Sequence, residues 1–241
     1  MRFAEFGYTA VNFTVLTFFE MIAAFSRKPS SPLALDEAGL KRFLDVCHIQ
    51  RYPARASVFS PGDPGNQLLF VIRGRLNIIA MGDDGQELVL NHVNAGDFVG
   101  EAGLFVPVAL RSVYLKTLEP CEIASIECET LVALMQGPLA PDAAKIMHSL
   151  GVQLAKRVME TSRKASSLAF FDVSARIWRA LDDLTHEPGA MTHPQGIQIK
   201  TSRQDLARIV GCSREMAGRV IKRLSDEGKM EAHGKTMVIY K

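Results

Sequence analysis

The sequence predicts an α+β fold with an N-terminal antiparallel β-barrel of jelly-roll type, a long helix, and a C-terminal winged helix-turn-helix. Three observations support this. Glycines recur every eleven or twelve residues through the first part, at Gly62, Gly74, Gly85 and Gly96. From residue 142 onward, apolar residues lie three or four apart, which is a helical period. Residues 201–224 combine two capping serines, a glycine turn and two apolar helix faces.

The length and the composition set the number of domains. The chain has 241 residues, enough for two modest domains that each bury a core. Hydrophobic residues make up 47% and charged residues 22%, as in ordinary globular proteins. The parts we expect are an extension at residues 1–34, a barrel at 35–140, a long helix and hinge at 141–170, and a winged helix-turn-helix at 171–241.

Charge is distributed unevenly along the chain. The formal net charge is only +2. Between residues 201 and 223, however, six Lys and Arg stand against two Asp and Glu. Positive charge concentrated on one predicted helix pair is typical of a nucleic-acid-binding surface. A solvated basic face would give the same count, so charge alone does not decide between them.

The cysteines and histidines indicate neither a metal site nor a disulfide. Cys47, Cys121, Cys128 and Cys212 form no CxxC pair, and no histidines cluster at ligand spacing. This pattern fits a reducing cytosol, so we expect a cytoplasmic protein without a metal or a cofactor. The sequence also has no nucleophile–base pair and no phosphate-binding P-loop, so we do not expect an enzyme. Turnover of a nucleotide remains the alternative.

The N-terminal extension has an unusual composition. Residues 6–19 are uncharged and rich in aromatics, but this stretch is too short to span a bilayer. A basic start and a small-residue cleavage site are both lacking. We expect a disordered extension or sequence upstream of a true start at Met21, and no membrane partner. A targeting or membrane role is the alternative.

The predicted barrel begins after a short helix at residues 36–47, where Leu40, Phe43, Leu44 and Cys47 lie at helical spacing. Short apolar runs between glycines then indicate strands of an antiparallel barrel or sandwich. A hairpin tip is expected at residues 83–85. The predicted strands lie at residues 68–72, 76–80, 87–93, 113–118 and 121–126.

The long helix carries one narrow apolar stripe. Such a stripe suits a helix that pairs with its own copy, so we expect a homodimer. A helix that lies on its own barrel is the alternative. A break is expected at residues 166–171, and Asp172 is a predicted N-cap for a helix at 173–184. The stripe consists of Ile146, Leu150, Leu154, Val158, Thr161, Ala165 and Leu168.

The helix-turn-helix follows a loop at residues 186–196 and a short strand at 197–200. Ser202 is a predicted N-cap with Asp205 three residues on, Gly211 suits a turn with positive φ, and Ser213 caps the second helix. The second helix presents Arg214, Glu215, Arg219 and Lys222 outward, and these residue types read base edges in the major groove. A structural helical hairpin is the alternative. Residues 230–240 predict a wing that turns at His233 and Gly234.

Several motifs closely resemble the CRP/FNR family of bacterial transcription regulators, over residues 35–240. They are VGCSRE (210–215), AMTHPQG (190–196), LAFFDV (168–173), AHGKT (232–236) and GDFVGEAGLF (96–105). The resemblance implies a global regulator, both activator and repressor, that binds palindromic double-stranded DNA as a homodimer. It further implies contact with RNA polymerase through residues 192–196, and cyclic AMP as a positive effector. A second polymerase contact is histidine-rich in the best-known members, whereas here only His48 remains and Gln50 replaces its neighbour.

The resemblance also implies roles for individual residues. Gly100, Glu101, Arg111 and Ser112 match the family's phosphate-binding cassette. Thr161 and Ser162 match two adenine contacts, one from each subunit, while Asn91 replaces a third that is normally serine. Arg214, Glu215 and Arg219 match base contacts. The positions that match contacts to the DNA backbone are Ser202, Arg203, Gln204, Ser213 and His233.

One departure bears on the effector. Residues 137–142 are longer than in the standard receptor and resemble a catabolite-activator-like branch of plant-pathogen regulators. That branch senses cyclic di-GMP, which releases it from DNA. The GDP at 62–64 and GVQLAKR at 151–157 resemble it too, whereas Ser112, Thr161 and Ser162 keep the cyclic AMP pattern. A constitutive regulator with a vestigial pocket is a further alternative.

Overall fold

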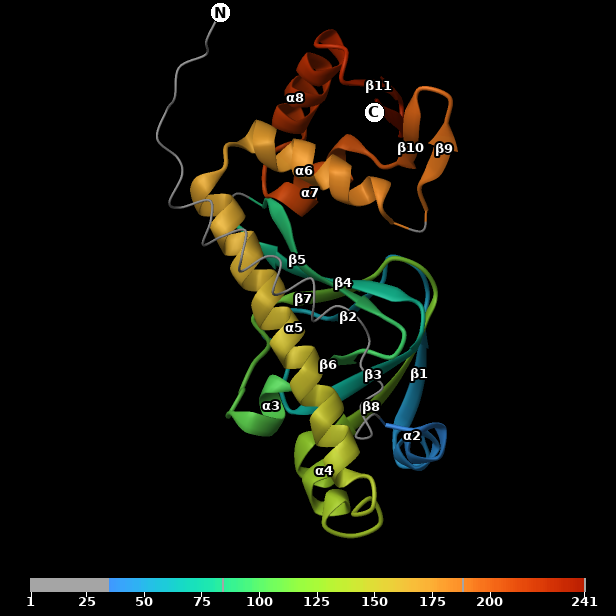
Figure 1. Ribbon diagram of the computed structural model, residues 1–241. Helices are drawn as coiled ribbons and strands as arrows, with labels where there is room; N and C mark the ends of the chain where they lie inside the picture. Colours follow the sequence, from blue (N-terminus) through green and yellow to red (C-terminus); the bar gives the residue numbers. More distant parts are fainter. Residues whose placement is uncertain (1–34, 84, 188, 241) are drawn as a thin grey trace, which may run out of the picture. The chain divides into compact units, whose positions relative to one another are not determined.

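The computed structural model describes residues 35–83, 85–187 and 189–240 (Figure 1). The expected extension at 1–34 and Asp84 of the predicted hairpin tip lie outside the described residues. The first helix, α2 (Glu37–Leu44), begins where Asp36 accepts a hydrogen bond from the Gly39 N–H at 2.7 Å. This side-chain cap explains why the helix starts there, since a free N–H at a helix start needs an acceptor.

Eight strands form two antiparallel sheets where a barrel was predicted. One sheet has the order β1 (His48–Tyr52), β8 (Cys121–Glu127), β3 (Gln67–Arg73), β6 (Phe98–Val99). The other has the order β2 (Ser57–Phe59), β7 (Tyr114–Thr117), β4 (Arg75–Met81), β5 (Glu87–Asn94). Neighbouring strands within each sheet are hydrogen-bonded, and no backbone ladder joins the two sheets in the described residues. The predicted barrel is therefore an open β-roll.

Two apolar clusters hold the roll together. The first lies between the sheets and includes Leu69 and Ile123 from one sheet and Leu76 and Leu115 from the other. The second covers the outer face of the β1-β8-β3-β6 sheet. There, α2, α4 (Cys128–Met135) and the start of α5 (Ala143–Phe170) surround the Phe43, Phe70 and Phe98 rings. The centroids of these rings lie 4.9–6.0 Å apart, a favourable range for aromatic pairs.

The predicted stripe on the long helix divides into two parts. Ile146 and Leu150 are fully buried against the roll, so the alternative of a helix on its own barrel is correct for this end. Val158 and Leu168 are exposed further along α5. The helix does not break at residue 166 as predicted. Its hydrogen bonding continues as far as the Phe171 N–H, which donates to the Ser167 carbonyl, and α5 ends at Phe170. Only the later part of α5 keeps a free apolar face.

The longer segment at residues 137–142 has a structural role. Leu139 is 1% exposed within the aromatic cluster. Asp142, at the start of α5, accepts two hydrogen bonds from the Arg42 guanidinium, at 2.7 and 2.8 Å. A bidentate pair of this kind fixes orientation as well as distance. The segment thereby joins α2 to the start of the long helix.

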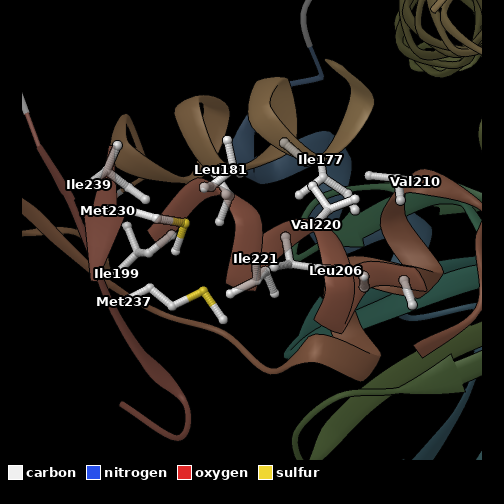
Figure 2. Close-up of a cluster of buried hydrophobic side chains, with 14 residues drawn as sticks. Ile177, Leu181, Ile199, Leu206, Val210, Val220, Ile221, Met230, Met237 and Ile239 are labelled. Atoms are coloured by element: carbon white, nitrogen blue, oxygen red, sulfur yellow. The ribbon is translucent and has the colours of Figure 1, made fainter. Parts of the chain in front are cut away.

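The C-terminal part packs three helices on a four-stranded sheet. The helices are α6 (Val173–Thr185), α7 (Arg203–Val210) and α8 (Arg214–Asp226). The sheet has the order β11 (Met230–His233), β12 (Thr236–Tyr240), β10 (Gly196–Lys200), β9 (Met191–His193). Strand β9 falls in the segment predicted as a loop. Ile177, Leu206, Ile221 and Met237 point toward one another in the shared core (Figure 2). The winged helix-turn-helix prediction is confirmed.

Candidate functional site

The cassette region begins directly after β6. Gly100 has φ +88°, and Glu101 precedes the short helix α3 (Ala102–Phe105). A Cβ added to Gly100 would lie 2.6 Å from Arg111 Nη1 and 2.5 Å from the Gln67 carbonyl oxygen. Only glycine therefore lets the Arg111 guanidinium lie against this backbone. The structure brings together the predicted cassette residues Gly100 and Arg111.

The Arg111 side chain is held in place from several directions. Its Nη2 donates to the Gln67 carbonyl at 2.5 Å, and its guanidinium lies 4.6 Å from the centre of the Phe59 ring. The Arg111 backbone bonds to the backbone of Asp63 and Gly62, at 2.8 and 2.9 Å, so the GDP segment lies beside Arg111. Burial lowers the pKa of Arg111, opposed by Cys128, Glu101 and Asp63.

One buried nitrogen of the Arg111 guanidinium, Nε, has no hydrogen-bond partner in the described residues. Beside Arg111, a cavity of about 410 Å³ opens between the sheets, lined also by Tyr52, Phe59, Asp63 and Gln67. A fixed guanidinium with an unused donor next to open space is suited to bind an anionic ligand.

Glu101 is paired with a side chain that the sequence did not predict at this site. Arg157 of α5 bonds to the Glu101 carboxylate, and these two side chains are only 15% and 8% exposed. Arg157 also donates to the Phe98 carbonyl at 2.6 Å, and Gln153 accepts from the Phe98 N–H at 2.8 Å. The four-residue spacing of Gln153 and Arg157 within GVQLAKR places both on the helix face that meets β6.

The same face of α5 continues along β5. The Lys164 ammonium donates to the carbonyls of Val89 and Leu90. Burial lowers the pKa of Lys164. Asn91, a predicted ligand contact, is buried and donates weakly to Glu160 at 3.4 Å, while its Oδ1 has no partner in the described part of the chain. An unsatisfied buried acceptor at this position is a candidate ligand contact.

The other predicted ligand contacts form no hydrogen bond with this network. Ser112, Thr161 and Ser162 are all exposed. Ser112 directly follows Arg111, while Thr161 and Ser162 are on α5 just past Glu160. No hydrogen bond within the described residues engages their hydroxyls. The structure therefore leaves these three hydroxyls accessible.

The helix-turn-helix is built by the predicted caps. The Ser202 hydroxyl accepts from the Asp205 N–H at 3.1 Å, and the Ser213 hydroxyl accepts from the Met216 N–H at 3.2 Å. Gly211 ends α7 with φ +69°, a conformation that favours glycine. The two serines that match contacts to the DNA backbone are thus also structural caps.

The outward face of α8 carries the predicted base-reading side chains. Arg214, Glu215, Arg219 and Lys222 are exposed. The backbone N–H of Glu215 and the Ser213 side chain lower the pKa of Glu215, so this carboxylate stays ionised. Three cations and one acceptor on the first turns of a helix can bond to base edges in the major groove.

The remaining predicted backbone contacts flank this helix. Arg203 and Gln204 are exposed at the start of α7. His233 is exposed at the end of β11, where its Nε2 lies 2.7 Å from the Glu231 carboxylate and lowers the pKa of Glu231. The described residues contain no cluster of three or more His, Cys, Asp or Glu that could hold a metal ion. Within the same residues, no helix is long and apolar enough to cross a membrane.

Comparison with known proteins defines the class. Residues 49–137 match the cyclic nucleotide-binding domain, and residues 199–229 match the bacterial regulatory proteins of the crp family. The chain belongs to this family of DNA-binding transcription regulators. It is 54% identical over 214 residues to the CRP-like protein Clp of Xanthomonas oryzae pv. oryzae, covering 89% of this chain and 93% of that relative. It is 53% identical to the Clp of Xanthomonas campestris pv. campestris over the same shares.

Solved structures agree. One is described as the c-di-GMP responsive global regulator CLP, which links cell–cell signalling to virulence gene expression in Xanthomonas campestris. It has a TM-score of 0.82 and 53% identity, covering 86% of this chain and 100% of that one. A CRP/FNR-family regulator of Thermus thermophilus has a TM-score of 0.64 at 22% identity, covering 80% and 94%, and shows the fold alone. The predicted resemblance, including the plant-pathogen branch, is confirmed.

Proposed function

We propose that this protein is a homodimeric regulator that binds palindromic DNA through α8 and is released from it by cyclic di-GMP bound at the cassette. The placement of Arg111 against Gly100, with one buried donor unused, carries the ligand part of the proposal. A ring of sugars and phosphates offers the anionic oxygens that such a guanidinium binds.

The choice of effector depends on the branch-specific segments. GDP at 62–64 holds the Arg111 backbone, GVQLAKR at 151–157 supplies the Arg157 partner of Glu101, and the longer 137–142 segment anchors α5. Each segment that resembles the plant-pathogen branch thus has a structural role, two of them at the cassette, and a c-di-GMP responsive regulator is 53% identical. Cyclic AMP as a positive effector is the second candidate, favoured by the accessible Ser112, Thr161 and Ser162.

The dimer is supported by the free face of α5. Val158 is 64% exposed, and Ala165 and Leu168 of the same stripe are exposed further along the helix. Exposed apolar side chains aligned on a helix mark an interaction surface. A two-fold dimer presents two copies of α8, which matches the two half-sites of a palindrome.

The route to RNA polymerase is a separate part of the proposal. Residues 192–196 span the end of β9, the turn at 194–195 and the start of β10, and Thr192, Pro194 and Gln195 are exposed there. We assign to this turn a contact that lets the regulator activate some promoters, while α8 alone suffices to repress others. The protein acts where the chromosome is, in the cytoplasm.

Calorimetric titration of the purified protein with cyclic di-GMP and with cyclic AMP tests the ligand part. We expect cyclic di-GMP to bind at micromolar concentration or tighter and Arg111→Ala to weaken it about tenfold or more. Tighter binding of cyclic AMP, together with a stronger gel shift, would establish the second candidate. Failure of both nucleotides to bind would leave a constitutive regulator.

A further inference from the structure

Strand β5 contacts three parts of the molecule. Asn91, a predicted ligand contact, donates to Glu160 of α5 at 3.4 Å, and the carbonyls of Val89 and Leu90 accept from Lys164 of the same helix. At the first residue of the strand, the Glu87 side chain meets Arg208 of α7, the first helix of the helix-turn-helix. One short strand thus carries a predicted ligand contact and touches both the long helix and the DNA-reading unit.

The Glu87 carboxylate is shared between two cations. Its Oε1 accepts from the Lys116 ammonium of β7 at 2.9 Å, and its Oε2 lies 2.6 Å from Arg208 Nε. Glu87 is only 15% exposed, so solvent screens this pair less than a surface pair. The Arg208 Nε forms no aligned hydrogen bond with any described residue, so the contact is an ion pair held by charge. Lys116 fixes the carboxylate to the roll, and Arg208 brings α7 to it.

An apolar contact lies next to this ion pair. A Cβ added to Gly211 would be 3.2 Å from Leu88 Cδ1 and 3.6 Å from Leu168 Cδ2. Gly211 forms the turn before α8, whose N-cap Ser213 is two residues on. Glu87 and Leu88 therefore hold the end of α7 and the turn that directs the recognition helix.

The strand provides a direct route between the two ends. β5 pairs with β4 along its length, from Arg75 opposite Asn94 to Met81 opposite Glu87. The register shifts between Ile78 and Ile79, so Leu90, which accepts from Lys164, has no partner opposite it. A bulge of this kind bends a strand locally and is common beside functional sites. Asn91 and Glu87 lie four positions apart on this one strand, so the strand is the shortest covalent path between the predicted ligand contact and the ion pair with α7.

We infer that the Glu87–Arg208 pair is the positioning contact through which occupancy of the ligand site changes the placement of α8. Arg208 acts through the position of α7 and not by touching DNA bases. The claim that cyclic di-GMP acts through this pair rests on the proposed function, whereas the claim that the pair positions α7 does not. The relevant quantity is the coupling ratio, defined as the DNA dissociation constant with saturating cyclic di-GMP divided by that without it.

A double-mutant cycle isolates the pair. By charge alone, Arg208→Gln weakens DNA binding and Glu87→Gln strengthens it, so the two variants shift the basal affinity in opposite directions. Their coupling ratios, however, should both move toward 1, by about threefold to tenfold. Because the two residues act as one unit, Glu87→Gln/Arg208→Gln should show the same ratio as either single variant. Arg208→Lys keeps the positive charge, so its coupling ratio should lie between those of Arg208→Gln and the wild type.

The matched control is Arg51→Gln, which removes a cation from the exposed Arg51–Glu122 pair on β1 and β8. Its coupling ratio should equal that of the wild type, measured by fluorescence anisotropy of labelled palindromic DNA. Calorimetry verifies that each variant still binds cyclic di-GMP. Unchanged ratios in the Glu87 and Arg208 variants, or effects that multiply in the double variant, would overturn the inference.

A second measurement separates this inference from the proposed function. If the wild type responds to no nucleotide, the proposed effector is wrong, but the contact is still testable by amide hydrogen exchange without nucleotide. We expect faster amide exchange at residues 206–211 in Glu87→Gln and in Arg208→Gln than in the wild type. The double variant should show the same increase as either single variant. Arg51→Gln should exchange at the wild-type rate. Exchange equal to the wild type in both single variants would show that the pair positions nothing.

Discussion

Arg157 of the long helix and Glu101 of the cassette form an ion pair whose two side chains are almost completely buried. Arg157 also bonds to the Phe98 carbonyl, so one guanidinium fastens α5 to the strand that leads into the cassette. A nucleotide hydroxyl that binds Glu101 has to share the carboxylate with Arg157 or replace it. The pair thus joins the candidate ligand site directly to the helix that carries the proposed dimer face.

Arg157→Ala tests the energetic weight of this pair. Removing the cation leaves the Glu101 carboxylate buried without a partner, so the free energy of unfolding should fall by about 3 kcal/mol in urea denaturation. In Arg157→Ala/Glu101→Gln the unpaired charge is gone, and the loss should be smaller than in Arg157→Ala alone. A larger loss in the double variant would mean that the ion pair is not what holds these residues.

Gly100→Ala tests the close approach of Arg111 to the backbone. The new Cβ would displace the guanidinium, so affinity for cyclic di-GMP should fall about tenfold or more in calorimetry. Gly96→Ala is the matched control, because Gly96 has φ +91° against +88° at Gly100 but open space around its Cβ. It should lose about 1 kcal/mol of stability from backbone strain and keep its nucleotide affinity. Gly100→Ala should lose more stability, because its Cβ also meets the Gln67 carbonyl. Equal affinity losses in both variants would mean that strain alone is responsible.

Arg214→Ala and Arg203→Ala should differ in how they change DNA recognition. Arg214 lies on the exposed first turn of α8, so its loss should cost about 1–3 kcal/mol at the cognate site and relax base preference at one position. Arg203 should contact phosphate, so its loss should weaken binding equally on all sequences and reduce the salt dependence. Anisotropy titrations on a set of single-base variants of the site distinguish these outcomes. If Arg214→Ala weakened binding equally on all DNA sequences, Arg214 would contact only phosphate.

Acid should release the contact between α2 and the start of α5. Hydrogen bonds from Arg42 lower the pKa of Asp142 below its ordinary value of 3.8. A carboxyl whose pKa is lower in the folded than in the unfolded state stabilises the fold above the unfolded value. This contribution is lost as the pH falls below 3.8 through the lowered pKa.

Asp142→Asn removes that dependence. Thermal unfolding should show a lower Tm for the variant at pH 7, with a difference from the wild type that shrinks below about pH 4. Lys145 lowers the pKa of Asp36 as well. Because Asp36 titrates in both the wild type and the variant, its contribution cancels in the Tm difference. A Tm difference that stays constant down to about pH 3 would show that Asp142 does not stabilise through its charge.

Local signals in the sequence predicted much of this fold. The caps at Ser202 and Ser213 and the turn at Gly211 each depend on residues within a few positions, and the structure has all three. The resemblance likewise located Gly100 beside Arg111. Strand β9 was missed because three residues among turn-forming neighbours carry little periodicity.

Contacts between distant residues could not be predicted in the same way. Arg157 with Glu101 and Arg208 with Glu87 pair residues more than fifty positions apart, and side-chain type does not specify which charges meet. The apolar stripe of α5 showed a continuous face, but not that Ile146 and Leu150 pack on the roll while Val158 stays free. The division follows from where the outer sheet face ends.

The central claim is that a cyclic dinucleotide at the cassette controls DNA binding by α8. The most direct measurement is the affinity of the wild-type protein for a palindromic site, by fluorescence anisotropy, as cyclic di-GMP is added. We predict a saturable loss of DNA affinity of about tenfold or more, with no such loss when cyclic AMP is added. DNA affinity that stays constant or rises while calorimetry shows cyclic di-GMP bound would contradict this account.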